Sequence, residues 1–293
     1  MLGRGGAPRS LWFALGRVLL LLLFVSSTSI SAAAAPASES ESESEEMAAA
    51  CPSDVPRVAK FADAGALSDA VASFVVEASR DAVARHGTFV VAFSGGSLPA
   101  AVAPGLLKRK AEVQWDRWRV VFADERHVPW DHADSNLRLV REALLDHVPV
   151  APEHVLGVNA RVPVETAAAE YAAAFAAAGG RLDLVLLGMG PDGHTASLFP
   201  GHPLLALTGG DVVVAPISDS PKPPPARITF TLGALNRASA VAFVATGASK
   251  AVLVARCAVP RAALEPEPLP AARVRPVSGS LVWFLDEAAA GKL

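Results

Sequence analysis

The sequence of 293 residues predicts an α/β fold, a single domain with a largely parallel, doubly wound, Rossmann-like sheet and helices on both faces. Short apolar segments alternate along the chain with longer segments in which apolar residues recur at helical spacing. The connections between them are short, which favours parallel strands joined by crossover helices. The segment 182–187 is rich in Leu and Val, which is typical of a strand buried on both faces.

The elements follow from this alternation in order along the chain. Strands are expected at 57–61, 88–93, 119–123, 182–187, 212–215, 227–231, 240–246 and 281–285. Helices are expected at 66–85, 99–108, 136–146, 164–178 and 249–257. In the first helix Leu67, Val71 and Val75 lie on one stripe, Pro99 fits the first turn of the second, and Gly179-Gly180 ends the alanine-rich fourth. The Pro-rich stretch 221–225 is interpreted as a surface loop, because the alternation resumes directly after it.

Residues 1–46 are interpreted as a targeting segment followed by a disordered Ser/Glu run. Arginines precede the apolar run 18–25, and small residues at 32–35 offer a cleavage site, which is the layout of a secretory signal peptide. Eight apolar residues are too few to span a membrane. The lack of an acidic residue before Glu39 also fits an organelle transit peptide, although the apolar run argues against it. The Ser/Glu run 38–46 is expected to be solvated and disordered.

Met47 offers a second start for the chain, and the folded catalytic domain is expected to span 55–293. The compartment is therefore predicted to be the cytoplasm if translation begins at Met47. It is predicted to be a plastid or the secretory route if residues 1–46 act as a transit or signal peptide.

Composition and charge exclude several classes of function. The net charge is −3 and no basic stripe lies beyond the N-terminus, so nucleic-acid binding is not expected. Cys51 and Cys257 are the only cysteines, and neither has CxxC or CxxH spacing. A disulfide framework and a structural metal site are therefore not expected. No stable membrane association is expected of the mature domain, and the oligomeric state is left open.

The segment 182–187 leads into a turn that holds an acid and a titratable base. The turn is Gly188-Met-Gly-Pro-Asp192-Gly-His194, so Asp192 and His194 lie two residues apart. Open parallel sheets bind ligands beyond the carboxyl ends of their strands, and glycines let the backbone approach a ligand closely. Imidazole exchanges protons near neutral pH. The turn therefore predicts a reaction site; the alternative is that Asp192 caps the next helix and His194 is an ordinary turn residue.

The turn Ser94-Gly95-Gly96-Ser97 follows another predicted strand and opens a helix. Glycines let backbone N–H groups point into one concavity, and the helix N-terminus adds positive potential. The turn is therefore a candidate phosphate site. The alternative is that a strand-to-helix turn contains Gly and Ser for steric reasons only.

Three consecutive charged residues, Asp124, Glu125 and Arg126, end a further strand. Such residues are costly to bury unless they are paired or bind a ligand, and the planar fork of Arg126 suits phosphate or sugar oxygens. The alternative is a solvated loop with an internal Asp–Arg pair. The pair Ser135-Asn136 is expected to cap the following helix, although its side chains can also face the crevice.

Two more cations and three histidines lie near these loops. Arg227 begins a strand after the Pro-rich loop, and Lys250 lies near the start of a helix. Together they can meet one anion across the crevice, although each alone is typical of a surface charge. The secondary candidates are His127, His132 and His202.

Taken in this order, the motifs resemble the 6-phosphogluconolactonase family. The resemblance rests on Ser94-Gly-Gly-Ser97, on Asp124-Glu-Arg126-x-Val-Pro129 with Asp134-Ser-Asn136, and on Gly188-Met-Gly-Pro-Asp192-Gly-His194-Thr-Ala-Ser-Leu-Phe-Pro200. Arg227-Ile-Thr229 and Gly247-x-x-Lys250 add to it, and it covers about residues 55–286.

The resemblance implies hydrolysis of 6-phospho-D-glucono-1,5-lactone to 6-phosphogluconate, the second step of the oxidative pentose phosphate pathway, without a metal or an organic cofactor. The partner is then a small phosphosugar lactone. His194 is expected to be the general base for water, oriented by Asp192. Phosphate is expected on the Ser94-Gly95-Gly96-Ser97 turn, with the cations Arg227 and Lys250 as counter-charges and Arg126 nearby. We further expect N–H groups of the glycine turn after 182–187 to stabilise the oxyanion.

Two alternatives stay open. The first is a glucosamine-6-phosphate deaminase/isomerase, a relative on the same fold that shares the Gly-x-Gly-x-Asp-Gly-His turn. That enzyme follows its His with Asn-Glu-Pro, whose carboxylate assists ring opening, whereas this chain has Leu198, Phe199 and Pro200 there. The second is a sugar-phosphate sensor without catalysis, which is disfavoured because His194, Arg227 and Lys250 are all present.

Overall fold

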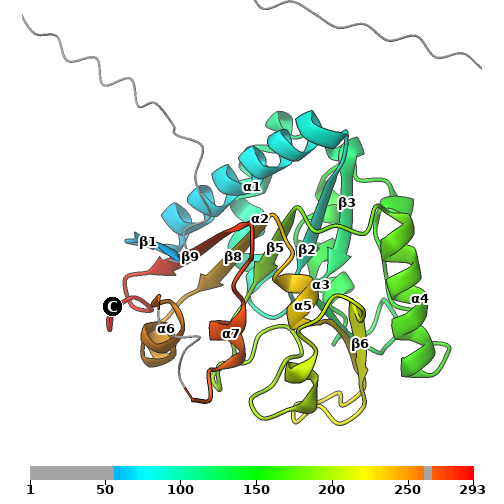
Figure 1. Ribbon diagram of the computed structural model, residues 1–293. Coiled ribbons are helices and arrows are strands. Elements are labelled where there is room, and N and C mark those ends of the chain that lie inside the picture. The colour runs from blue at the N-terminus through cyan, green and yellow to red at the C-terminus, as the bar shows by residue number, and fades with distance from the viewer. Residues whose placement is uncertain (1–55, 261–265) are drawn as a thin grey trace, which may run out of the picture. The chain divides into compact units, whose positions relative to one another are not determined.

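A parallel sheet lies at the centre of the computed structural model, which describes residues 56–260 and 266–293 (Figure 1). Its six strands lie in the order β1-β9-β8-β5-β2-β3, and every neighbouring pair is parallel. The strands are β1 (Arg57–Phe61), β2 (Phe89–Phe93), β3 (Trp118–Phe122), β5 (Leu184–Leu187), β8 (Ala240–Ala245) and β9 (Ser280–Asp286). The predicted α/β class is confirmed. The interpretation of residues 1–46 lies outside the described residues.

A second, smaller sheet was not predicted. It consists of β4 (Asp124–Arg126), β7 (Arg227–Phe230) and β6 (Val214–Ile217) in the order β4-β7-β6, and both of its pairings are antiparallel. The strands expected at 212–215 and 227–231 therefore lie outside the parallel sheet, and the charged segment 124–126 is itself a strand. A segment of three residues has no readable period, and its pairing with β7 joins residues about a hundred positions apart.

Helices cover both faces of the parallel sheet (Figure 1). One face is covered by α1 (Ala64–His86), α2 (Leu98–Lys108) and α3 (Asn136–Ala143), whose apolar residues share a core with the strands. The other face is covered by the small sheet and by α4 (Val164–Ala177), α5 (Leu232–Leu235), α6 (Ala251–Cys257) and α7 (Pro270–Arg273). Short 3₁₀ helices lie at Lys110–Glu112, Trp115–Arg117, Leu145–His147, Pro152–His154, Pro203–Ala206 and Ala248–Lys250. No helix in these two described ranges is long and apolar enough to cross a bilayer.

Strand β5 alternates between the two cores, as the sequence predicted for a strand buried on both faces. Leu184 and Leu186 pack into the core shared with α1 and α2, whereas Val185 and Leu187 pack into the core shared with α4. All four side chains are fully buried, and each such burial stabilises the fold by about 1.5–3 kcal/mol. The loop after β5 therefore starts from a rigid base.

The helix ends differ slightly from those predicted. Helix α1 begins after Asp63, whose Oδ1 accepts a hydrogen bond from the Ala66 N–H (2.8 Å), and it ends at Gly87 with φ of 82°. The helix expected over 136–146 stops at Ala143 and continues as a 3₁₀ turn. The helix expected over 249–257 begins with a 3₁₀ turn at Ala248–Lys250. None of these differences moves a predicted site residue to another loop.

Close packing of α1 on α2 predicts a large effect of one methyl group. A Cβ at Gly105 would lie 2.3 Å from the Ser68 carbonyl oxygen, and a backbone atom cannot move aside as a side chain can. We expect Gly105→Ala to lower the free energy of unfolding by about 1–3 kcal/mol in chemical denaturation. The control Gly209→Ala meets no atom within 4 Å and should change it by less than about 1 kcal/mol. Equal stabilities of the two variants would contradict this packing.

Candidate functional site

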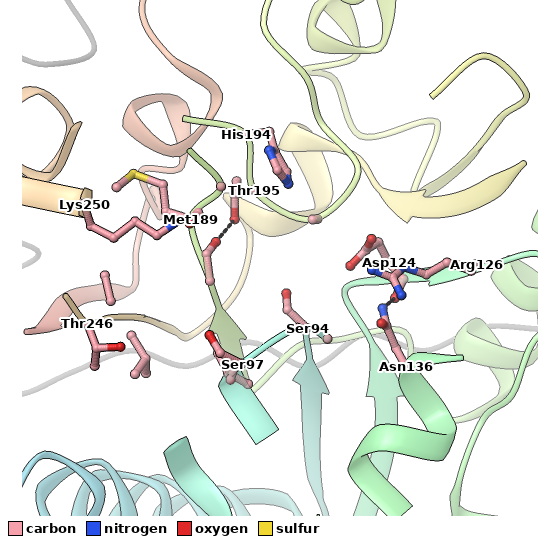
Figure 2. Close-up of a pocket in the computed structure, with 18 of the residues that line it drawn as sticks. Ser94, Ser97, Asp124, Arg126, Asn136, Met189, His194, Thr195, Thr246 and Lys250 are labelled. Atoms are coloured by element: carbon pink, nitrogen blue, oxygen red, sulfur yellow. Dashed lines mark hydrogen bonds between the residues drawn. The ribbon is translucent and has the colours of Figure 1, made fainter. Parts of the chain in front are cut away.

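A polar cleft lies beyond the carboxyl ends of the central strands, where an open parallel sheet is expected to bind its ligand (Figure 2). Its volume is about 250 Å³. It is lined by Ser94–Leu98, Asp124, Arg126, Asn136, Gly188–Gly190, His194–Ala196, Arg227, Val244–Thr246 and Lys250. Every site residue predicted from the sequence lines it except Asp192, which contacts His194. Of the secondary candidates, none of His127, His132 and His202 lines it.

The glycine turn after β5 lets the imidazole lie against the backbone. A Cβ at Gly190 would lie 1.9 Å from the His194 Cε1 atom, so a larger residue at this position would displace the ring. The Gly190 N–H donates to the His194 carbonyl (2.8 Å), and the Gly193 N–H donates to the Gly190 carbonyl (3.1 Å). These two amides are therefore already engaged, and the oxyanion-binding role that we expected of the glycine turn does not fall on them.

His194 and Asp192 form a hydrogen-bonded pair. An ionised carboxylate can only accept, so the Nδ1–H of the imidazole donates to Asp192 Oδ1. The ring also packs on Phe199, with centroids 4.8 Å apart. Burial would raise the pKa of Asp192, but the hydrogen bond from His194 and the positive charge that the ring carries at low pH lower it to about 2. Burial lowers the pKa of His194 below its usual value, against the opposing effect of Asp192. The neutral imidazole with a free Nε2 is therefore the resting form.

The turn after β2 presents unused donors to the cleft. Gly96 has φ of 68°, and helix α2 begins two residues later. Ser94 Oγ is buried and forms no hydrogen bond with the described residues. The Ser97 side chain does not cap α2, so its hydroxyl is free for a ligand. Two hydroxyls and a helix N-terminus thus line the same cleft, which suits an anion.

Strand β4 holds two consecutive buried carboxylates, which excludes the solvated loop considered from the sequence. Asp124 and Glu125 are 5% and 1% exposed. Asp124 Oδ2 accepts a hydrogen bond from Ser197 Oγ (2.7 Å) and lies 4.0 Å from Arg227 Nη1. Glu125 accepts from the N–H groups of Arg126 (2.7 Å), Asn136 and Leu137 (both 2.8 Å). Burial raises the pKa of Glu125 to about 7, against these hydrogen bonds, which lower it.

Arg126 and Asn136 form the other side of the cleft. Arg126 Nη1 donates to the Asp134 carbonyl (2.6 Å), while its Nε is buried without a partner among the described residues. Asn136 Nδ2 donates to the Asp124 carbonyl (2.8 Å), and its buried Oδ1 likewise has no described partner. Ser135, and not Asn136, caps α3, since its Oγ accepts from the Arg138 N–H (3.2 Å). The sequence therefore undervalued Asn136: once Ser135 is the cap, its neighbour is free to face the cleft.

The two remaining cations have different surroundings. Lys250 Nζ donates to the Met189 carbonyl (2.8 Å), which leaves further donors for a ligand. Arg227 is 3% exposed, and its Nε and Nη2 donate to the carbonyls of the loop 222–224. Much of the Arg227 guanidinium is thus occupied by protein. In Figure 2, Lys250 and Arg126 lie on opposite sides of the cleft, with Ser94 between them.

Comparison with known proteins gives the same family as the motifs. The family described as glucosamine-6-phosphate isomerases/6-phosphogluconolactonase matches residues 62–283. A human 6-phosphogluconolactonase is 44% identical over 258 residues, which cover 83% of this chain and 95% of that protein. The chain belongs to the 6-phosphogluconolactonase family. Another member, a probable 6-phosphogluconolactonase 3, chloroplastic, of Oryza sativa subsp. indica, is 41% identical over 78% of this chain and 73% of its own length.

Solved structures agree with this family membership. The crystal structure of 6-phosphogluconolactonase from Thermotoga maritima is 29% identical, with a TM-score of 0.67, over 79% of this chain and 99% of that one. A monomeric glucosamine-6-phosphate deaminase is 18% identical, with a TM-score of 0.66, over 81% of this chain and all of the other (100%). The likeness to the deaminase concerns the fold alone. Since both kinds of enzyme share this fold, only the residues of the site can distinguish a 6-phosphogluconolactonase from a deaminase. Within the described ranges, no cluster of three or more His, Cys, Asp or Glu side chains could hold a metal ion.

The buried hydrogen bonds of Glu125 predict that removing its side chain strongly destabilises the protein. Glu125→Ala leaves three N–H groups at the start of α3 and in β4 without their acceptor. We expect a loss of about 3–5 kcal/mol in the free energy of unfolding, measured by denaturant titration. The matched control is Glu142→Ala on the same helix, where an exposed carboxylate pairs with Arg138 (2.7 Å); it should cost less than about 1 kcal/mol. Similar losses for both variants would show that Glu125 does not anchor α3.

Proposed function

We propose that this chain hydrolyses 6-phospho-D-glucono-1,5-lactone to 6-phospho-D-gluconate, the lactonase step of the oxidative pentose phosphate pathway. The observation that carries the proposal is the His194–Asp192 pair, held at the edge of a cleft whose other walls offer N–H groups, hydroxyls and cations. The names of its relatives, at up to 44% identity, support the same substrate. The reaction needs only a base, a water molecule and anion-binding groups.

His194 serves as the general base in this mechanism. Asp192 fixes the imidazole proton on Nδ1, so Nε2 accepts the proton of a water molecule as its oxygen attacks the lactone carbonyl carbon. The tetrahedral intermediate then collapses, the bond between that carbon and the ring oxygen breaks, and the imidazolium returns its proton to the departing ring oxygen. The oxyanion would be bound by the N–H group of Ala196, a residue that lines the cleft beside His194 and whose N–H donates to no described backbone acceptor.

The two sides of the cleft suit the two ends of the substrate. The Ser94–Ser97 turn, the N-terminus of α2 and Lys250 would hold the phosphate, since they combine N–H groups, hydroxyls and a cation. Arg126, which is only partly buried and lines the opposite wall of the cleft, would bind sugar hydroxyls. Arg227 would contribute positive potential through Nη1 while its other nitrogens hold the loop 222–224.

Phe199 argues against the deaminase alternative. At the position where that enzyme is expected to carry its ring-opening carboxylate, Phe199 is 2% exposed and packs against the His194 ring. A phenyl group cannot accept a proton, so sugar-ring opening and loss of an amine have no partner there. A non-catalytic sensor would not need a base, whereas His194 is hydrogen-bonded to Asp192 and neutral, which is the form that can accept a proton. The sensor is therefore disfavoured.

The compartment stays a prediction that depends on residues 1–46. A relative named as chloroplastic supports a plastid destination for a chain that carries this segment. A start at Met47 would leave the enzyme in the cytoplasm. N-terminal sequencing of the mature protein separates a cut near Ala35, a later transit-peptide cut and a start at Met47.

Replacing the base gives the decisive test of the function. His194→Asn keeps a side-chain donor for Asp192 and removes Nε2, so we expect kcat to fall about 10²–10⁴-fold, while 6-phosphogluconate still binds in calorimetry. Turnover is followed as 6-phosphogluconate formed from fresh lactone, with spontaneous opening subtracted. The control is His202→Asn, which alters a second His–Asp pair (His202 Nε2 to Asp219, 3.1 Å) outside the cleft and should leave kcat within about twofold.

Three results would count against the proposal. A fully active His194→Asn enzyme would exclude this base. A wild-type chain that binds 6-phosphogluconate but does not hydrolyse the lactone would favour the sensor. Release of ammonia from glucosamine-6-phosphate by the wild type would favour the deaminase.

The lowered pKa of His194 predicts the pH dependence. The base works only when the imidazole is neutral, and burial lowers its pKa below the usual value of about 6.5. We therefore expect kcat/KM to be constant at neutral pH and to fall tenfold per pH unit only below that lowered pKa. The measurement is a pH–rate profile from pH 4.5 to 8 in buffers of constant ionic strength. An acid limb centred above pH 7 would contradict the neutral resting form.

A further inference from the structure

Lys222 lies behind the catalytic histidine, in the loop between β6 and β7, part of which (221–225) is predicted from the sequence to be a surface loop. Its Nζ is 3.0 Å from His194 Nδ1 and 3.4 Å from Asp192 Oδ1. It does not line the cleft, so it approaches the imidazole on the side of Nδ1 and not from the substrate side. A cation in this position can act on the reaction only through the His194–Asp192 pair.

The backbone of Lys222 is firmly held. Arg227 Nη2 donates to the carbonyls of Lys222 (2.8 Å) and Pro223 (2.9 Å), and Arg227 Nε donates to Pro224 (3.0 Å). Ser220 Oγ donates to the Lys222 carbonyl (2.9 Å) and accepts from its N–H (3.3 Å). Arg227 is itself buried beside Asp124. The backbone that carries the lysine is therefore fixed beside the site, and its side chain, 35% exposed, reaches back to the His194–Asp192 pair.

Hydrogen-bond chemistry restricts what the three groups can do together. An ammonium group only donates, and an ionised carboxylate only accepts. Since the Nδ1–H of His194 donates to Asp192, Nδ1 has no lone pair left for Lys222, whose hydrogen bond must go to Asp192 Oδ1. A second proton on the ring would then place two positive charges about 3 Å apart. The arrangement thus stabilises a neutral imidazole with its proton on Nδ1.

We propose that Lys222 is a positioning residue for the hydrolysis: its ammonium group shares the Asp192 carboxylate with His194 and so keeps the imidazole neutral, with Nε2 free to take the proton of water. Without Lys222, the carboxylate would raise the pKa of His194 and so increase the fraction of imidazolium, which cannot act as a base. The inference rests on the proposed role of His194, but the charge state of the imidazole can be measured independently of activity.

The other charged groups around the ring agree with this balance. Asp192 on the same loop and Asp124 from β4 raise the pKa of His194, whereas burial and Lys222 lower it. Lys250, from the turn after β8, interacts electrostatically with both Lys222 and Asp192. Arg227 lies beside Asp124, so Lys222 is the cation that acts against Asp192 at the ring. Removing Lys222 takes this positive charge away from the ring, while burial still lowers the pKa of His194.

The test compares Lys222→Met with the wild type in the full chain. The pKa of His194 is read from the pH dependence of its ring signals by NMR, and the signal is assigned by its loss in His194→Asn. We expect this pKa to rise by about one pH unit or more, and the acid limb of kcat/KM to move upward by the same amount. If the pKa rises by one pH unit, kcat/KM should fall about tenfold at pH values that lie below both the wild-type and the variant pKa. At pH 8.5 it should return to within about threefold of the wild type.

Matched variants separate the charge from the fold. Lys222→Gln keeps a hydrogen-bond donor for Asp192 but removes the charge, so it should also raise the pKa of His194. This variant replaces Lys222→Met in the test if Lys222→Met does not fold. Lys222→Arg keeps the charge and should hold the pKa near that of the wild type. Lys108→Met removes an exposed lysine that pairs with Asp69 on the α1–α2 surface (2.8 Å) and should change nothing.

The outcomes distinguish this inference from the proposed function. An unchanged His194 pKa in Lys222→Met and Lys222→Gln, or a loss of activity that is equal at every pH, would overturn the role of Lys222. A raised pKa with an unchanged pH–rate profile would support the effect of Lys222 on the imidazole and overturn His194 as the base.

Discussion

The site depends on two carboxylates that are buried side by side in strand β4. Alternation along the strand sends Asp124 toward the cleft and Glu125 toward the start of α3. Charged groups are costly to bury unless their hydrogen bonds are complete, and each of these carboxylates is surrounded by donors from distant segments. Because those donors must lie within about 3 Å of the oxygens, the two residues fix the relative positions of several loops.

A continuous chain of contacts connects these carboxylates to the imidazole of His194 and to the walls of the cleft. Glu125 holds the N-terminus of α3, and α3 presents Asn136 to the cleft. On the other side, Asp124 lies beside the buried Arg227, whose guanidinium holds the loop that carries Lys222. Lys222 in turn contacts both Asp192 and His194, the pair that we propose acts in catalysis. The imidazole is thus set by packing on Phe199 and Gly190 and by charges placed through β4 and β7.

Arg227 and Lys250 look equivalent in the sequence but have different surroundings in the structure. Arg227 offers several donors in a rigid plane, so a single buried side chain can hold three successive carbonyls. Lys250 is a compact charge with one protein acceptor and spare donors, which suits the mobile oxygens of a phosphate. Two side chains of the same formal charge therefore differ: Arg227 holds a loop of the protein, whereas Lys250 keeps donors that are available in the cleft.

The sequence by itself determined the α/β class, the position of most helices and strands, and the loops that meet at the cleft. These follow from local periodicity and from the rule that parallel strands end at one edge. Only the tertiary structure decided that 124–126 is a strand of a separate antiparallel sheet, that Asn136 faces the cleft, and that Lys222 stands behind His194. The physical reason is that each depends on contacts between residues far apart in the chain, where burial and hydrogen-bond geometry, and not local pattern, select the partner.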